Sequence, residues 1–179
     1  HFRVVVLGYL TFAAAETGER RDVLRWAVEA TQVVADHRLD ATAGGAIAAT
    51  AAAIAHQIRG DHVAAAQQLE AVRERRRYVP GIVWIEADLA LRCADVSLDL
   101  GDASGALAFT QVAGDKLQGY PDPGALPLRL ERVEQRIRQG QAYGLTSAEL
   151  RILSFLPTHL SLQEIADQLF LARSTVKTH

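Results

Sequence analysis

The sequence is poor in cysteine, methionine and aromatic residues. Among its 179 residues it has one cysteine, no methionine and 6% aromatic residues. A single cysteine, Cys93, excludes an internal disulfide and a cysteine-rich metal cage, and its apolar neighbours predict a small buried side chain. An excess of charge of one sign is also absent, since the formal net charge is -2. This balance excludes a polybasic binder held to nucleic acid by its overall charge, so any contact with DNA would be local.

The sequence also lacks a hydrophobic segment long enough to span a membrane. The apolar stretch from Val4 to Ala15 lies between Arg3 and Glu16 and is shorter than the roughly 20 residues that a bilayer requires. We interpret this stretch as a core helix. No cleavable signal is present, which predicts a cytoplasmic protein without a membrane partner. Because the sequence begins without methionine and in mid-pattern, we expect it to be a piece of a longer protein.

Strict alternation of apolar and polar residues, the pattern of a half-buried strand, is absent as well. Alanine, valine and leucine recur at helical spacing instead, which predicts an all-α fold. Gly18, Gly60 and Gly101 lie 42 and 41 residues apart, and an acidic residue follows each of them. A glycine at this point favours a tight turn that joins two helices. The spacing therefore predicts three helical hairpins.

Small residues follow each of these glycines by five and by twelve positions. They are Val23 and Ala30, Ala65 and Val72, and Ala106 and Ala113. The pattern resembles the packing signature of tetratricopeptide-like helical hairpins, with a period longer than the usual repeat of about 34 residues. The resemblance implies that residues 1 to about 119 stack as a solenoid with a continuous core.

A proline-rich segment ends the repeat pattern. Pro121 and Pro123 cannot continue a helix, and the sequence after them predicts another helix over residues 125–139. Its apolar stripe, which should cap the stack, consists of Leu126, Leu130, Val133 and Ile137. Two glycines then mark a linker. We therefore predict a helical-repeat domain over residues 1–140 that senses an effector or a protein partner.

The segment 145–179 contains the same helix-start motif twice. Thr146 precedes Glu149 by three residues, and Ser161 precedes Glu164 by the same interval. In such a capping box, the two side chains bond to the free backbone amides of the first helical turn. Each pair therefore predicts the start of a helix.

The second of these helices is expected to be about nine residues long. A corner at residues 170–172 follows it, and a third helix begins near Arg173. A short helix, a tight corner and a helix with small polar and basic residues are typical of a helix-turn-helix, whose last helix enters the major groove of DNA.

Together these residues resemble the C-terminal helix-turn-helix of LuxR-type (GerE-like) transcription regulators. The matching positions are Leu145, Thr146, Glu149, Leu160, Ser161, Glu164, Ile165, Ala166, Leu169, Thr175, Val176, Lys177 and His179. Helical hairpins before such a domain are similar to the MalT-like regulators, which carry a nucleotide-binding module upstream; this chain has no phosphate-binding Gly-Lys loop. The resemblance implies a regulator that binds double-stranded DNA and forms a homodimer when complete. We expect no cofactor.

The resemblance also implies which residues contact DNA. They are Arg173, Ser174, Thr175, Lys177 and Thr178, with Val176 as the inward anchor. Lys177 and Thr178 would lie in the groove, whereas Thr175, with Arg173 or Ser174, would hold phosphates. The sequence ends at His179, inside the recognition helix as the family has it. We therefore expect these 179 residues alone to bind duplex DNA poorly; tight, sequence-specific binding in a gel shift at low salt would contradict this.

A protein-interaction scaffold without DNA binding is the alternative function. In that case the last helices would only cap the repeats, and the face that carries Lys177 would be buried against residues 125–139. An enzyme is not supported, because the sequence has no Gly-x-Ser-x-Gly elbow and no partner for Cys93. The histidines are scattered singly, without the spacing of a metal site.

The arginine run and the two tryptophans lead to further structural predictions. Arg73, Arg75, Arg76 and Arg77 form a basic run that is either a solvated helix end or a docking patch. Trp26 and Trp84 lie on helix faces among valine and alanine, which predicts that both belong to the core between hairpins.

Overall fold

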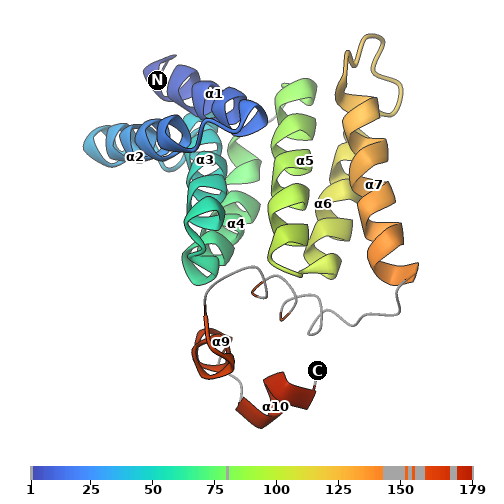
Figure 1. Ribbon diagram of the computed structural model, residues 1–179. Helices are drawn as coiled ribbons and strands as arrows, with labels where there is room; N and C mark the ends of the chain where they lie inside the picture. The colour runs from blue at the N-terminus through green and yellow to red at the C-terminus, as the bar shows by residue number, and fades with distance from the viewer. Residues whose placement is uncertain are drawn as a thin grey trace.

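The computed structural model describes residues 2–79, 81–142, 152, 155, 160–169 and 173–178. In chain order its helices are α1 (Phe2–Thr17), α2 (Arg20–His37), α3 (Ala43–Arg59), α4 (His62–Arg75), the 3-10 turn η1 (Arg76–Tyr78), α5 (Val83–Asp99), α6 (Ala103–Leu117), α7 (Leu126–Ala142), α9 (Leu162–Gln168) and α10 (Arg173–Thr178). These ranges contain no strand, so the predicted all-α fold is confirmed. Figure 1 shows α1 to α7 as a stack of helices, with α9 and α10 below it in this view. None of the helices in the described ranges is both long and apolar enough to cross a bilayer.

Helices α1 to α6 form hairpins at the repeated glycines, as predicted. Gly18, Gly60 and Gly101 have φ angles of 77°, 81° and 73°. In this left-handed conformation, which glycine adopts without a Cβ clash, the backbone amides turn back toward the preceding helix. The amide of Gly60 donates to the carbonyl oxygen of Gln57 at 2.9 Å, and the amide of Gly101 to that of Leu98 at 2.9 Å.

The small residues of the repeat signature lie where the helices touch. Relative exposure is 0% for all of them: Val23, Ala30, Ala65, Val72, Ala106 and Ala113. Larger side chains at these positions would separate the helices, because protein interiors are close-packed. The repeated pattern therefore predicted the helix contacts correctly.

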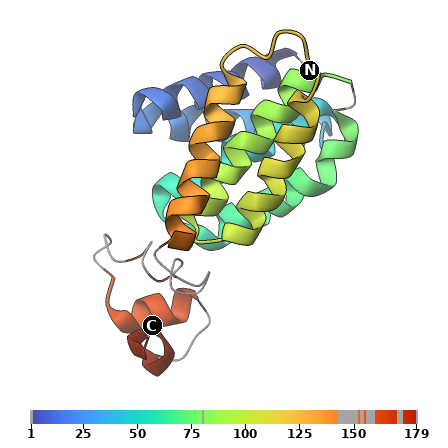
Figure 2. The same ribbon diagram turned by 90° about the vertical axis from the view of Figure 1, so that its right-hand side faces the viewer.

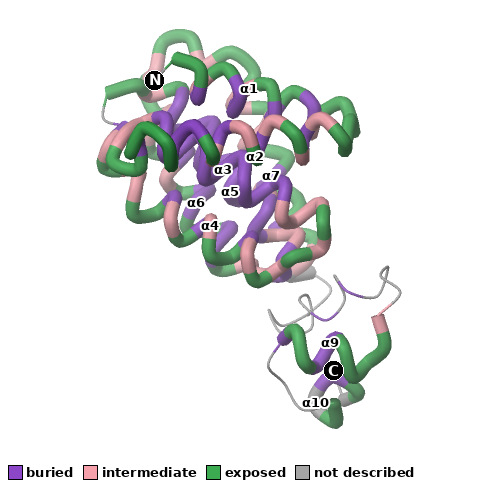
Figure 3. Tube along the Cα trace, turned by 90° about the vertical axis from the view of Figure 1, so that its left-hand side faces the viewer, coloured by how far each residue is buried: buried purple, intermediate pink, exposed green. Residues whose placement is uncertain are grey.

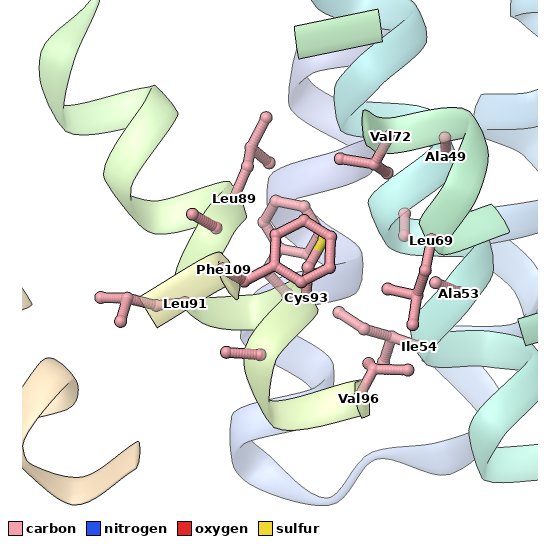
Figure 4. Close-up of a cluster of buried hydrophobic side chains, with 14 of the residues drawn as sticks. Ala49, Ala53, Ile54, Leu69, Val72, Leu89, Leu91, Cys93, Val96 and Phe109 are labelled. Atoms are coloured by element: carbon pink, nitrogen blue, oxygen red, sulfur yellow. The ribbon is translucent and has the colours of Figure 1, made fainter. Parts of the chain in front are cut away.

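Helices α3 and α5 form the centre of the stack. Every residue of α3 from Gly44 to Ala55 is buried, and Figure 3 shows the buried residues concentrated in these central helices. Alanine permits this arrangement, since its short side chain lets several helices pack closely around one. Figure 4 shows Phe109, Leu69 and Cys93 in the core cluster.

Cys93 is fully buried, as predicted. Its Sγ lies 3.8 Å from Oγ1 of Thr50. Burial raises the pKa of the thiol to about 12, which keeps it protonated and unreactive at neutral pH.

Helix α7 covers the end of the stack, turned toward α5 and α6 (Figure 2). Val133 and Ile137 are buried in the core that the hairpins share. Helix α7 begins after the prolines, as predicted, and extends to Ala142. The described chain thus has a stack of hairpins closed by a capping helix.

Ion pairs join the polar side of α7 to α5. Arg129 Nη2 lies 3.2 Å from Asp95 Oδ2. Arg136 Nη1 and Nη2 lie 2.7 Å from Asp95 Oδ1 and from Asp99 Oδ1, respectively. Arg129 and Arg136 therefore bind carboxylates that α5 presents, while the apolar stripe of α7 packs into the core.

The pKa of Asp99 gives these ion pairs a testable pH dependence. Burial outweighs the bond from Arg136 and raises the pKa of this carboxyl above its ordinary value of 3.8. The folded state therefore binds the Asp99 proton more tightly than the unfolded state does, and this group's contribution to stability declines as the pH rises from 3.8 toward the raised value.

We expect Asp99→Asn to gain stability relative to the unsubstituted chain as the pH rises through that interval, because asparagine does not ionise. Urea unfolding at a series of pH values measures the difference. Asp122→Asn, in the exposed connection before α7, is the control. A difference that is independent of pH, or one of the opposite sign, would contradict the expectation.

Of the two tryptophan predictions, the one for Trp84 is wrong and the one for Trp26 is confirmed. Trp84 is 45% exposed, so its assignment to the core was wrong. It is the second residue of α5, and its ring lies on Tyr9 with the centroids 6.0 Å apart. Trp26 is partly buried against the core, which agrees with the prediction.

The basic run at the end of α4 is involved in contacts within the stack. Arg75 Nη2 lies 2.5 Å from Asp40 Oδ1, and Nη1 of the same side chain donates to the carbonyl oxygen of Gly45. The guanidinium of Arg73 lies over the ring of Phe109, 4.8 Å from its centroid. Arg75 therefore ties the end of α4 to the start of α3 in the same hairpin, and Arg73 contacts α6 of the next hairpin.

Candidate nucleic-acid interface

A capping box fixes the start of α9, as predicted. The amide of Glu164 donates to Ser161 Oγ at 3.3 Å, and the amide of Ser161 donates to Glu164 Oε2 at 2.7 Å. The bond from the Ser161 backbone lowers the pKa of the Glu164 carboxyl. The other predicted box, formed by Thr146 and Glu149, lies outside the described residues.

A small core of its own holds α9 and α10 together. Its buried members are Ile152, Phe155, Ile165, Ala166, Leu169 and Val176, with Leu160 packed against them. Helices of 7 and 6 residues are too short to be stable alone in water, so this packing is what maintains them. Val176 is 3% exposed, which confirms its predicted role as the inward anchor.

Helix α10 begins at Arg173, where the sequence predicted the third helix. Arg173, Ser174 and Lys177 are exposed. Arg173 and Lys177 are four residues apart, so their side chains share one face of the helix. The backbone of Thr175 and Thr178 belongs to α10, while their side chains lie outside the described part of the structure. Three of the five predicted DNA-binding side chains are thus placed on an exposed surface.

The unit formed by α9 and α10, the α9–α10 unit, has few charged residues, and its cations and anions lie on different helices. Within residues 160–169 and 173–178, the cations are Arg173 and Lys177 on α10, whereas Glu164 and Asp167 lie on α9. Gln163 Nε2 donates to Asp167 Oδ1 at 2.9 Å, on the surface of α9. A phosphate backbone would therefore be attracted to the α10 side and repelled from α9.

The unit touches the stack through an aromatic contact that the sequence did not indicate. The rings of His62 and Phe155 stack with centroids 4.1 Å apart and an interplanar angle of 31°. His62 is the first residue of α4, and Phe155 is 1% exposed. His62 appears in the sequence as an isolated histidine, so no local pattern could have predicted this contact.

A metal centre is not found in the described ranges, since they contain no group of three or more His, Cys, Asp or Glu side chains that could hold an ion. The site is therefore described by the side chains of α9, α10 and their contact with α4. No protein-family model, no curated protein and no solved structure matches the chain.

Proposed function

We propose that this chain is a DNA-binding transcription regulator of the LuxR type, with the helical repeats as the module that senses an effector or protein partner. The observation that carries the proposal is the arrangement of α10. Its apolar residue Val176 packs onto α9, while Arg173 and Lys177 face solvent. A helix held in this way presents its polar side to a groove. The regulator would act in the cytoplasm, where its DNA is accessible.

The proposed mechanism follows from the two short helices. Helix α9 supports α10 at the back, and α10 enters the major groove. Arg173 and Ser174 are near its start, where side chains reach phosphates, and Lys177 lies one turn further along, where it reaches a base edge or a phosphate. By the sequence resemblance, Thr175 and Thr178 contribute to the same surface. A homodimer would place two such helices on one DNA site.

Two features favour this regulator over a scaffold in which the last helices merely cap the repeats. The end of the stack is covered by α7, through Val133 and Ile137. Helices α9 and α10 have a separate core, and Lys177 is exposed rather than buried against α7. If α9 and α10 only capped the repeats, the exposed face of α10 would therefore have no role.

Lys177→Ala provides the test. We expect the chain to bind a fluorescein-labelled duplex of mixed sequence weakly and in a salt-dependent way, and Lys177→Ala to weaken that binding. The slope of log K against log salt should fall by about 1 if Lys177 holds a phosphate, and binding should fall by about 1–3 kcal/mol if it reads a base. Fluorescence anisotropy at low salt measures both.

Arg138→Ala is the matched control, since Arg138 is an exposed cation on α7. It removes the same charge from the stack and should change binding little. Equal losses from the two variants would mean that only overall charge attracts DNA. That result would overturn the assignment of α10 as the reading helix.

A further inference from the structure

A cavity of about 530 Å³ lies between the repeat stack and the α9–α10 unit. We name it the junction cavity. Figures 1 and 2 show α9 and α10 below the stack of α1 to α7. The stack contributes apolar side chains that include Val63, Leu69 and Leu100, and the other unit contributes Phe155 and Leu169. Its volume is within the range of small-molecule sites, about 300–1,000 Å³.

The charged groups at this cavity already have partners. Arg73 Nη1 lies 2.8 Å from Glu70 Oε2, and its Nη2 lies 3.9 Å from Asp102 Oδ2. Asp102 Oδ1 accepts bonds from the Gly105 amide at 2.9 Å and from Ser104 Oγ at 2.8 Å. An ionic ligand would have to disrupt these pairs, so the cavity does not favour a charged group.

Two amide side chains line the cavity from opposite units. Gln67 comes from α4 and Gln168 from α9. Within the described residues, neither amide side chain forms a hydrogen bond. Both side chains are exposed at the cavity rim. Each can both donate and accept a hydrogen bond, so either can bond to a neutral polar group in the cavity.

We propose that the junction cavity binds an uncharged organic molecule with an apolar body and a hydrogen-bonding group. The body would contact Leu69, Leu100 and Phe155, and its polar group would bond to Gln67 or Gln168. Phe155 and Leu169 also belong to the core that supports α10. A ligand here would therefore favour one placement of the α9–α10 unit on the stack and change its affinity for DNA. This last consequence rests on the proposed function, whereas binding itself does not.

The test uses the uncharged fluorophore N-phenyl-1-naphthylamine, which has an aromatic body and one N–H donor. We expect its fluorescence to rise in a saturable way on addition to the full chain. Ala66→Phe should weaken binding about tenfold or more, because Ala66 lines the cavity and the new ring occupies the space of the probe. Ala35→Phe is the matched control, at an exposed position of α2 away from the cavity.

Gln168→Phe fills the same cavity from the opposite side and provides a second, independent variant. 1-Anilinonaphthalene-8-sulfonate, which has the same ring system with a sulfonate, should bind more weakly than the uncharged probe. Equal binding of the probe to Ala66→Phe, Gln168→Phe and the unsubstituted chain would overturn the cavity as the site. Tighter binding of the sulfonate would overturn the ligand class. Since these titrations contain no DNA, they can succeed even if the proposed function fails.

Discussion

Gly45→Ala is expected to destabilise the chain by about 1–3 kcal/mol or more, through overpacking against backbone. Gly45 lies in the first turn of α3, where its amide donates to Oγ1 of the N-cap residue Thr42 at 3.2 Å. A Cβ atom at Gly45 would lie 2.5 Å from the carbonyl oxygen of Asp40 and 2.6 Å from that of Leu39. Backbone oxygens cannot move aside as a flexible side chain can. The start of the central helix would have to shift.

The same substitution at Gly114 should have the opposite sign. Gly114 lies within α6, and a Cβ there would meet nothing within 4 Å. Alanine favours a helix interior over glycine by about 0.5–1 kcal/mol, so Gly114→Ala should be stabilising. Urea unfolding followed by circular dichroism measures both variants. A Gly45→Ala variant as stable as the unsubstituted chain would contradict the close approach at the start of α3.

Arg92→Met is expected to destabilise the chain by about 3 kcal/mol, because it leaves a buried carboxylate with weaker pairing. Arg92 Nε lies 2.9 Å from Asp88 Oδ2, and its Nη2 lies 3.0 Å from Glu16 Oε1. Its guanidinium also lies over the ring of Phe12, 4.2 Å from the centroid. The side chains of Arg92 and Asp88 are only 9% and 8% exposed. Methionine retains much of the packing and removes the charge.

Arg138→Met is the control for Arg92→Met. Arg138 and Glu134 form a pair at 3.5 Å in which the side chains are 65% and 42% exposed, so its loss should cost at most about 0.5 kcal/mol. Arg129 Nη1, 3.5 Å from Asp88 Oδ1, would be the remaining partner of this carboxylate. Asp88→Asn in the Arg92→Met background should restore part of the stability, since it removes the buried charge that Arg92 had paired. Unfolding free energies give the whole set. Equal small effects at Arg92 and Arg138 would show that the buried pair does not stabilise the stack.

The repeat architecture was predictable because it depends on local chemistry. Gly60 takes a left-handed turn that few other residues tolerate, and Ala65 and Val72 recur at a spacing that places them on one helix face. Both signals are present in the order of residues along the chain. They were sufficient to predict the hairpins and their contacts.

Contacts between residues distant in the sequence were not predictable in the same way. Trp84 has the apolar neighbours of a core residue, yet it is 45% exposed near the start of α5. Arg75 pairs with Asp40, 35 positions earlier, only because α4 folds back onto the start of α3. Such contacts depend on how hairpins stack, which periodicity does not specify.

In the candidate interface, too, local features were predictable from the sequence and contacts between distant segments were not. Capping chemistry predicted the start of α9 at Ser161. The family resemblance predicted an exposed Lys177 and an inward Val176, and the structure gives both this exposure. Helix α9 is shorter than the expected nine residues or so, because it ends at Gln168. The contact of His62 with Phe155 joins segments that no sequence pattern relates.

We propose that α10 is the surface that meets DNA. Titration of the ¹⁵N-labelled full chain with duplex DNA at low salt, followed by amide NMR shifts, tests it most directly. We expect the largest changes in amide shift at residues 173–178, smaller changes on α9 and little change in α1 to α7. Changes centred on the repeat stack, with α10 unaffected while DNA is bound, would contradict it.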